Sequence, residues 1–124
     1  MKKEYIVTND YLSQKGLDLN NYAIDGTSIQ AIINDGLDLL VTRIAYLDDR
    51  LGGADKDIEE EIANYIDEHP KKLGAFLKAQ YRVIYNLVFQ AETSPTDPFV
   101  DNIIVHELGL GKINGFQKGV FYKQ

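Results

Sequence analysis

The sequence predicts a mainly α protein: a small helical bundle of three main helices plus short terminal helices, with an extended or hairpin C-terminal arm. Apolar residues recur every three or four positions in three separate segments, which is the spacing of helices with one buried side. Capping and helix-breaking residues separate those segments. With 124 residues, the chain is long enough for one domain with a core of its own.

The first 26 residues mix short apolar pieces with turn-forming Asn, Asp and Gly, so we expect a loosely structured lead-in. Within it, Thr8 or Asn9 can cap a short helix over Tyr11–Lys15, and Gly16 can end that helix.

The first main helix is predicted to begin at Thr27, because Gln30 follows three residues later as in a capping box. Gly52-Gly53 ends the segment. Gly36 lies inside it and marks either a close contact between helices or a tolerated glycine. The predicted buried stripe is Ile29, Ile33, Leu37, Leu40, Ile44 and Leu47.

The second main helix is acidic at its start, where a helix dipole favours carboxylates, and Asp55 or Asp57 can open it. We expect it to end near His69, because the residue before a proline avoids helical geometry, and Pro70 can then begin the next helix. Its predicted buried stripe is Ile58, Ile62, Tyr65 and Ile66.

The third main helix, Lys71 to about Ala91, is apolar nearly all round. A helix of this kind is buried on several sides. We therefore expect either the central helix of the bundle or a helix shared with another subunit.

Two prolines in Thr93–Pro98 predict a turn after the third helix. Residues 99–108 fit a short helix or a short strand, and we favour a helix that Asp101 caps and Gly109 ends. The domain prediction is a helical core over residues 1–108 and a docking arm over residues 109–124, in which Asn114-Gly115 fits a hairpin turn.

The chain has no cysteine, which excludes disulfides, thiolate zinc sites and cysteine nucleophiles. No apolar run approaches the roughly 20 residues needed to cross a bilayer, and the start of the chain lacks the apolar stretch of a signal peptide. These features predict synthesis in the cytoplasm without export, and no membrane partner.

Charge is divided unevenly along the chain. Residues 1–70 carry 6 basic and 15 acidic residues, whereas residues 71–124 carry 7 basic and 4 acidic residues. The net charge of −6 disfavours general nucleic-acid binding. The division reflects either ordinary solvated helix faces or a subunit whose acidic part meets the basic part of a neighbour.

No motif predicts a catalytic, cofactor or metal site, so the prediction is a protein that is not an enzyme. Gly109, Gly111 and Gly115 fall one residue off the dinucleotide fingerprint, and too little chain follows for the helix that would bind phosphate. His69 and His106 lack ligand spacing. The acidic runs Glu59–Glu61 and Asp48-Asp49 are interpreted as solvated helix faces. An enzyme whose site forms without a local signature stays open as a third class.

The last 16 residues, "GLGKINGFQKGVFYKQ", hold four glycines, three lysines and no acidic residue. Aromatic rings on such a segment are poor core material but suit contact with another protein surface. The alternative is that Phe116 and Phe121 fold back onto their own helices. The predicted protein-interface residues are Lys112, Asn114, Phe116, Lys118, Val120, Phe121 and Tyr122.

The order of these features resembles the head–tail adaptor (connector) proteins of tailed bacteriophages. It consists of the lead-in "YIVTNDYLSQKGLDL", the capped helix "TSIQAIINDGLDLLVTRIAYL", an acidic helix, "LKAQYRVIYNLV" and the glycine-aromatic arm. The resemblance spans most of the chain and rests on pattern and size.

The resemblance implies a structural virion protein in the neck of the particle, assembled in the host cytoplasm. About a dozen copies would form a ring below the portal protein and extend the DNA channel towards the tail. Implied partners are the portal protein, neighbouring subunits, and tail or stopper proteins, with DNA only as channel cargo. The alternative is a small dimeric helical regulatory or antitoxin-like binding module that uses residues 71–91 as its interface.

Overall fold

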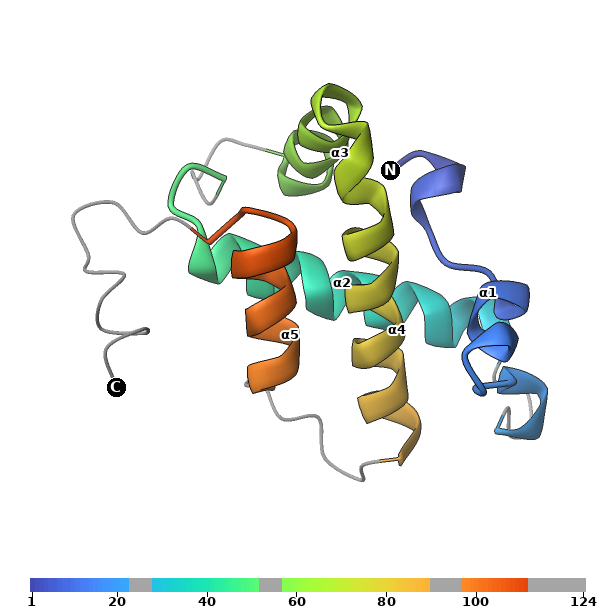
Figure 1. Cartoon of the computed structure of the whole chain (residues 1–124). Coiled ribbons are helices and arrows are strands. Elements are labelled where there is room, and N and C mark those ends of the chain that lie inside the picture. The colour runs from blue at the N-terminus through green and yellow to red at the C-terminus, as the bar shows by residue number, and fades with distance from the viewer. Residues whose placement is uncertain (23–27, 52–56, 90–96, 112–124) are drawn as a thin grey trace.

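The computed structural model describes residues 1–22, 28–51, 57–89 and 97–111, and these residues form helices without any strand. The mainly α prediction is therefore confirmed. Two layers cross (Figure 1): α2 (Ile29–Leu47) forms one, and α4 (Leu73–Phe89) and α5 (Pro98–Asn102) lie across it as the other. Of the predicted C-terminal arm, residues 109–124, the structure describes residues 109–111, and residues 112–124 lie outside the described residues.

The N-terminal segment forms the 3₁₀ turn η1 (Lys3–Tyr5), helix α1 (Asn9–Gln14) and the 3₁₀ turn η2 (Leu19–Asn21). Thr8 caps α1, since its hydroxyl accepts a hydrogen bond of 3.1 Å from the Tyr11 N–H. Gly16 follows α1 with a φ of +91°, a left-handed conformation that favours glycine. The predicted cap and stop are both confirmed.

The prediction of a loosely structured lead-in is wrong. Leu12, Leu17 and Leu19 are fully or almost fully buried, and they form a small core cluster with Ile33 of α2 and Ile84 of α4. The turn-forming residues reverse the chain so that its apolar residues meet this cluster, instead of leaving the segment loose.

The N-cap of α2 lies one residue later than the predicted cap, Thr27. Ser28 is its N-cap, because the Ser28 hydroxyl accepts a hydrogen bond of 3.0 Å from the Ala31 N–H. The Gln30 side chain bonds to Asn34 at 3.0 Å. The helix ends at Leu47, before the predicted glycine pair, and Thr27 lies outside the described residues.

Helix α3 (Ile58–Glu68) is capped by Asp57, whose carboxylate accepts a hydrogen bond of 3.2 Å from the Glu60 N–H. It ends before Pro70, as predicted, and the 3₁₀ turn η3 (Pro70–Lys72) leads directly into α4. Ile62 and Ile66 are buried at the predicted positions, whereas Ile58 and Tyr65 are partly buried.

Helix α4 is the central helix of the described core, because it contacts α2, α5, η1, η3 and η4. It crosses α2 at Gly36, where an added Cβ atom would lie 2.4 Å from Cγ1 of Ile84. The close-contact interpretation of Gly36 is therefore confirmed. Only one side of α4 is fully buried, and it consists of Phe76, Ala79, Gln80 and Ile84.

Gln80 joins α4 to the N-terminal segment from inside the core. Its side-chain N–H donates to the Tyr5 carbonyl at 2.7 Å, and its carbonyl oxygen accepts from the Val7 N–H at 3.2 Å. Tyr5 is the last residue of η1 and Val7 lies between η1 and α1, so Gln80 supplies the partners that a longer helix or a sheet would otherwise provide.

Helix α5 continues into a single π-helical turn, η4 (Ile103–Glu107), so the preference for a helix over a strand is confirmed. The predicted cap is wrong. Asp97 caps α5 by accepting from the Phe99 N–H at 2.9 Å, because Pro98 favours the first helical position. Asp101 instead accepts two hydrogen bonds from Arg43, of 2.8 and 2.7 Å.

The main core cluster lies between the two layers and extends up to α3. It draws buried residues from α2, α3, α4, α5 and η4, including Ile44, Ile66, Phe76 and Ile104. Within the described segments, no helix combines the length and the apolar character that crossing a membrane requires.

Candidate functional site

The seven predicted interface residues, Lys112 to Tyr122, lie outside the described residues, so their contacts stay predictions. The described chain does include the root of that segment. Residues Gly109–Gly111 follow η4 and run back to the C-terminal end of α2.

A fully buried carboxylate, Asp48, holds this root. The Gly111 N–H donates to Asp48 Oδ2 at 2.8 Å. Arg50 donates to the same carboxylate from Nε at 3.0 Å, from Nη2 at 2.7 Å and from its backbone N–H at 3.0 Å. These bonds raise the pKa of the Arg50 guanidinium, first through the hydrogen bond to Asp48. These donors compensate the cost of burying the Asp48 carboxylate. Because the Gly111 N–H is one of them, the start of the arm is fixed to the end of α2.

Two glycines permit this path. Gly109 and Gly111 have φ values of +76° and +92°, in the region that favours glycine. A Cβ atom at Gly111 would also approach Cγ2 of Val105 to 2.9 Å. The Gly111 N–H therefore binds the protein's own Asp48, and the positive φ values explain why glycine stands at positions 109 and 111.

Side chains of α3 and η3 form hydrogen bonds to the residues just before Gly109. The Tyr65 hydroxyl donates to the Leu108 carbonyl at 2.6 Å, and Lys72 Nζ donates to the Glu107 carbonyl at 3.0 Å. Leu110 is almost completely buried in the main core cluster. The core thus extends to Gly111, three residues beyond the predicted boundary at 108.

The outer side of α4 carries a cation between two rings. The Arg82 guanidinium lies 4.7 Å from the Phe99 ring centre and 5.2 Å from that of Tyr85, and its Nε donates to Asp97 at 3.0 Å. The Tyr85 and Phe89 rings are 4.7 Å apart. Phe99 and Phe89 are 65% and 50% exposed, so these rings form an accessible surface.

Burial raises the pKa of Asp97, but the hydrogen bonds that it accepts from Asn86, from the Phe99 N–H and from Arg82 outweigh this effect. The net result is a pKa below the usual value for aspartate. Asp97 therefore stays ionised, and it holds Arg82 in position between the two rings.

The outer side of α2 also carries large exposed apolar side chains. Tyr46 is 70% exposed and Leu39 is 41% exposed, and the acidic residues Asp35 and Asp38 are exposed beside them. Arg43 lies next to Tyr46, with its guanidinium 5.0 Å from the ring centre, but it is bonded to Asp101.

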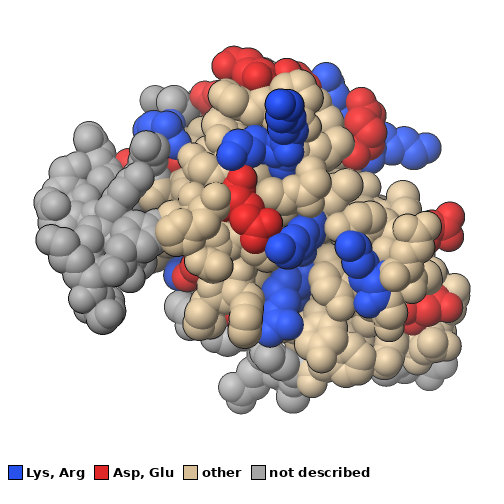
Figure 2. Space-filling model, viewed as in Figure 1, with Lys and Arg blue, Asp and Glu red and all other residues tan. Residues whose placement is uncertain are grey.

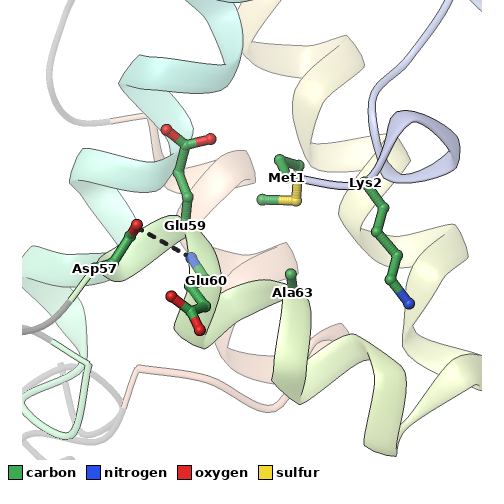
Figure 3. Close-up of a pocket in the computed structure, with 6 residues that line it drawn as sticks. All are labelled: Met1, Lys2, Asp57, Glu59, Glu60 and Ala63. Carbon is green, nitrogen blue, oxygen red and sulfur yellow. Dashed lines mark hydrogen bonds between the residues drawn. The ribbon is translucent and has the colours of Figure 1, made fainter.

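The acidic start of α3 borders a shallow hollow of about 430 Å³, shown in Figure 3. Its lining residues are Met1, Lys2, Asp57, Glu59, Glu60 and Ala63. Asp57 is used as the helix cap, and Lys2 bonds to Asp67 at 2.7 Å. The hollow is open and its carboxylates are those of a helix start, so we assign no ligand to it.

In the part of the chain that the structure describes, no group of three or more His, Asp or Glu side chains is placed to hold a metal ion. His69 lies at the end of α3, where its Nδ1 is 2.9 Å from the Tyr65 carbonyl oxygen and its ring stacks on Tyr65 at 4.5 Å. His106 is exposed on η4.

No protein-family model, curated protein or solved structure matches this chain.

Sequence reasoning missed two features of this site. The interpretation of Asp48 as solvated is wrong, because the chain returns to it 63 residues later through Gly111. The signal was present in the glycines at 109 and 111, since two glycines so close together often mark backbone that must pass close to other groups. The outer rings of α4 were recognised as excess apolar surface, but their pairing with Arg82 had no sequence signature.

Proposed function

We propose that this chain is a structural virion protein, a ring-forming head–tail adaptor that docks below the portal and extends the DNA channel towards the tail. In this proposal the helical core makes the ring, and residues 112–124 bind the portal or a neighbouring subunit. It is not an enzyme, and its position is the neck of the virion.

The observation that carries the proposal is the fixed root of the arm. A basic, acid-free segment with three aromatic rings starts at Gly111, which the buried Asp48 holds against α2. Fixing the first residue of a docking segment lowers the entropy cost of binding, because the segment has less conformational freedom to lose. The resemblance in the order of the helices and the arm supports the same function.

The test compares the full chain with a truncated chain, residues 1–111. Deletion from residue 109 would be a poor test, because it removes the buried Leu110 and the Gly111 bond to Asp48. We expect the truncated chain to keep its helical circular dichroism and to lose binding to a portal protein from the same phage, as measured by co-sedimentation and electron microscopy.

Substitutions within the full-length arm make the test sharper. Phe116→Ala with Phe121→Ala removes two rings, whereas Gln117→Ala with Gln124→Ala changes two polar positions of the same segment. We expect only the first pair to weaken portal binding. Equal binding by both pairs, or an unfolded truncated chain, would remove the arm from this role.

One observation favours a second candidate, a dimeric binding module. The rings of Tyr85 and Phe89 stand on the outer side of α4, within the helix that this candidate uses as its interface. Sedimentation separates the two functions: a stable dimer favours the module, whereas a closed ring or a portal-dependent ring favours the adaptor.

A further inference from the structure

Two outer surfaces of the molecule belong to opposite layers of the fold. The α2 face consists of Asp35, Asp38, Leu39 and Tyr46, which are spaced by three, four, seven and eleven residues and so share one side of the helix. The α4 face consists of Lys71, Lys78, Arg82, Tyr85, Phe89 and Phe99. Because α2 and α4 press their inner sides together at Gly36 and Ile84, their outer sides face away from each other (Figure 1).

The two faces have opposite charge. Asp35 and Asp38 are exposed on the α2 face, and Arg43, the one basic residue of α2, is bonded to Asp101. Lys and Arg side chains gather along the α4 face, as Figure 2 shows.

The carboxylates beside the α4 face are engaged within the chain. Glu107 bonds to Lys78 at 3.0 Å, and Asp97 bonds to Arg82 at 3.0 Å. The α4 face therefore still offers more positive than negative charge to a partner.

The apolar side chains on these faces are also suited to association. Leu39 and Tyr46 stand on one face, and Phe89 and Phe99 stand on the other, each at least 41% exposed. Tyr, Phe and Arg in this arrangement are the residue types that carry most binding energy at protein interfaces.

We propose that the α2 face of one copy packs against the α4 face of the next copy, so that the chain is its own partner. Asp35 and Asp38 then meet the Lys71 and Lys78 region, and the exposed rings of the two faces pack together. The contact joins two different surfaces on opposite sides of the subunit, so it repeats from copy to copy as a ring requires. This inference rests on the proposed ring function and names the surfaces that join its subunits.

The same charges disfavour a symmetric dimer through α4. Two α4 faces in contact would bring the excess positive charge of both copies together, and like charges placed face to face oppose association. Pairing α4 with α2 removes this repulsion and places carboxylates opposite the lysines.

The experiment uses the full chain and reverses the charge of one face at a time. Sedimentation velocity follows self-association up to the solubility limit. We expect the unchanged chain to associate. We expect Asp35→Lys with Asp38→Lys, and separately Lys71→Glu with Lys78→Glu, to weaken association roughly a hundredfold or more. The control, Glu60→Lys with Glu68→Lys, makes the same charge change as the aspartate pair but on α3, outside both faces, and should associate normally.

Mixing the two face variants in equal amounts is the decisive measurement. Each variant repels itself, but its remaining face complements the reversed face of the other, so the mixture should recover association as alternating assemblies. Circular dichroism confirms that each variant is folded, and the milder pair Asp35→Asn with Asp38→Asn should give an intermediate loss.

Three results would overturn this contact: an unchanged chain that stays monomeric at every concentration, an Asp35→Lys/Asp38→Lys variant that associates normally, or a mixture that fails to recover. The adaptor function is judged separately by arm-dependent portal binding. Portal-bound rings that still form with both aspartates reversed would reject the contact alone. Recovery in the mixture without any portal binding would keep the contact and reject the adaptor.

Discussion

The inner and outer sides of α4 are built from similar residue types but are used differently. On the inner side, Phe76, Gln80 and Ile84 are fully buried and meet α2 or the N-terminal segment. On the outer side, Phe89 and the neighbouring Phe99 of α5 remain half or more exposed, and the Phe99 ring contacts Arg82. Apolar character in the sequence therefore does not by itself distinguish residues of the chain's own core from residues that stay on its surface.

A matched pair of phenylalanines should show the largest difference between the two sides. Phe76→Ala removes a fully buried ring, so we expect the free energy of unfolding to fall by about 3–5 kcal/mol. Phe99→Ala removes an exposed ring and should change it by less than about 1 kcal/mol. Urea denaturation measures both variants, and equal losses would contradict the assignment of Phe99 to an outer face.

The next largest effect is expected at Gln80. Gln80→Ala would leave the buried Val7 N–H and the Tyr5 carbonyl without their partner, so we expect a loss of about 2–4 kcal/mol. The exposed Gln14 provides the control, and Gln14→Ala should change stability by less than about 0.5 kcal/mol. Hydrogen exchange should also show faster opening of residues 5–7 in the Gln80 variant, and unchanged exchange there would argue against this link.

Two helical glycines allow a comparison between the α2–α4 crossing, at Gly36, and an exposed position, at Gly74. At Gly36 an added methyl group would meet Ile84, so Gly36→Ala should destabilise by about 1–3 kcal/mol. At Gly74 the same methyl group would meet no atom within 4 Å, so Gly74→Ala should stabilise by about 0.4–1 kcal/mol. Thermal unfolding of the two variants should give shifts of opposite sign, and a stable Gly36→Ala variant would mean that the helices can move apart.

The smallest expected effect is the pH-dependent contribution of Asp97, on the outer side of α4, to the free energy of unfolding. The pKa of Asp97 is lowered in the folded chain, so its contribution is fully present above the unfolded value of about 3.9 and is lost as pH falls through the lower folded value. Asp97→Asn keeps a capping side chain but removes the charge, and it should destabilise by about 1 kcal/mol at neutral pH.

Unfolding of the wild-type chain and of the Asp97→Asn chain, each measured at pH 7, 4 and 3, tests this sign. The difference between the two chains should shrink as the pH is lowered. A difference that is the same at all three pH values would show that the charge of Asp97 is not responsible.

Helix positions were predictable because they depend on local patterns. The spacing of Ile33, Leu37 and Leu40 predicted α2, and Pro70 predicted the break before α4. N-caps were harder to predict where two candidate residues were adjacent: Ser28 rather than Thr27 caps α2.

Features that depend on distant parts of the chain were not predictable. The burial of Asp48 requires Gly111, and the order of the lead-in requires Ile33 and Ile84 to supply the rest of its cluster. The sequence around a residue does not show which distant residues it will contact. For the same reason, charges on α2 and α4 could be counted in the sequence, but the layers that set them on opposite sides could not.

The Asp48–Gly111 hydrogen bond also limits the distance that residues 112–124 can reach from the core. Residues 112–124 can span at most about 45 Å when fully extended, so each of them stays within that distance of the end of α2. A short tether of this kind turns a second binding event into an intramolecular one, at an effective concentration in the millimolar range. In the proposed ring, several weakly binding arms would therefore bind tightly together, and the ring would dissociate only when many arms dissociate at the same time.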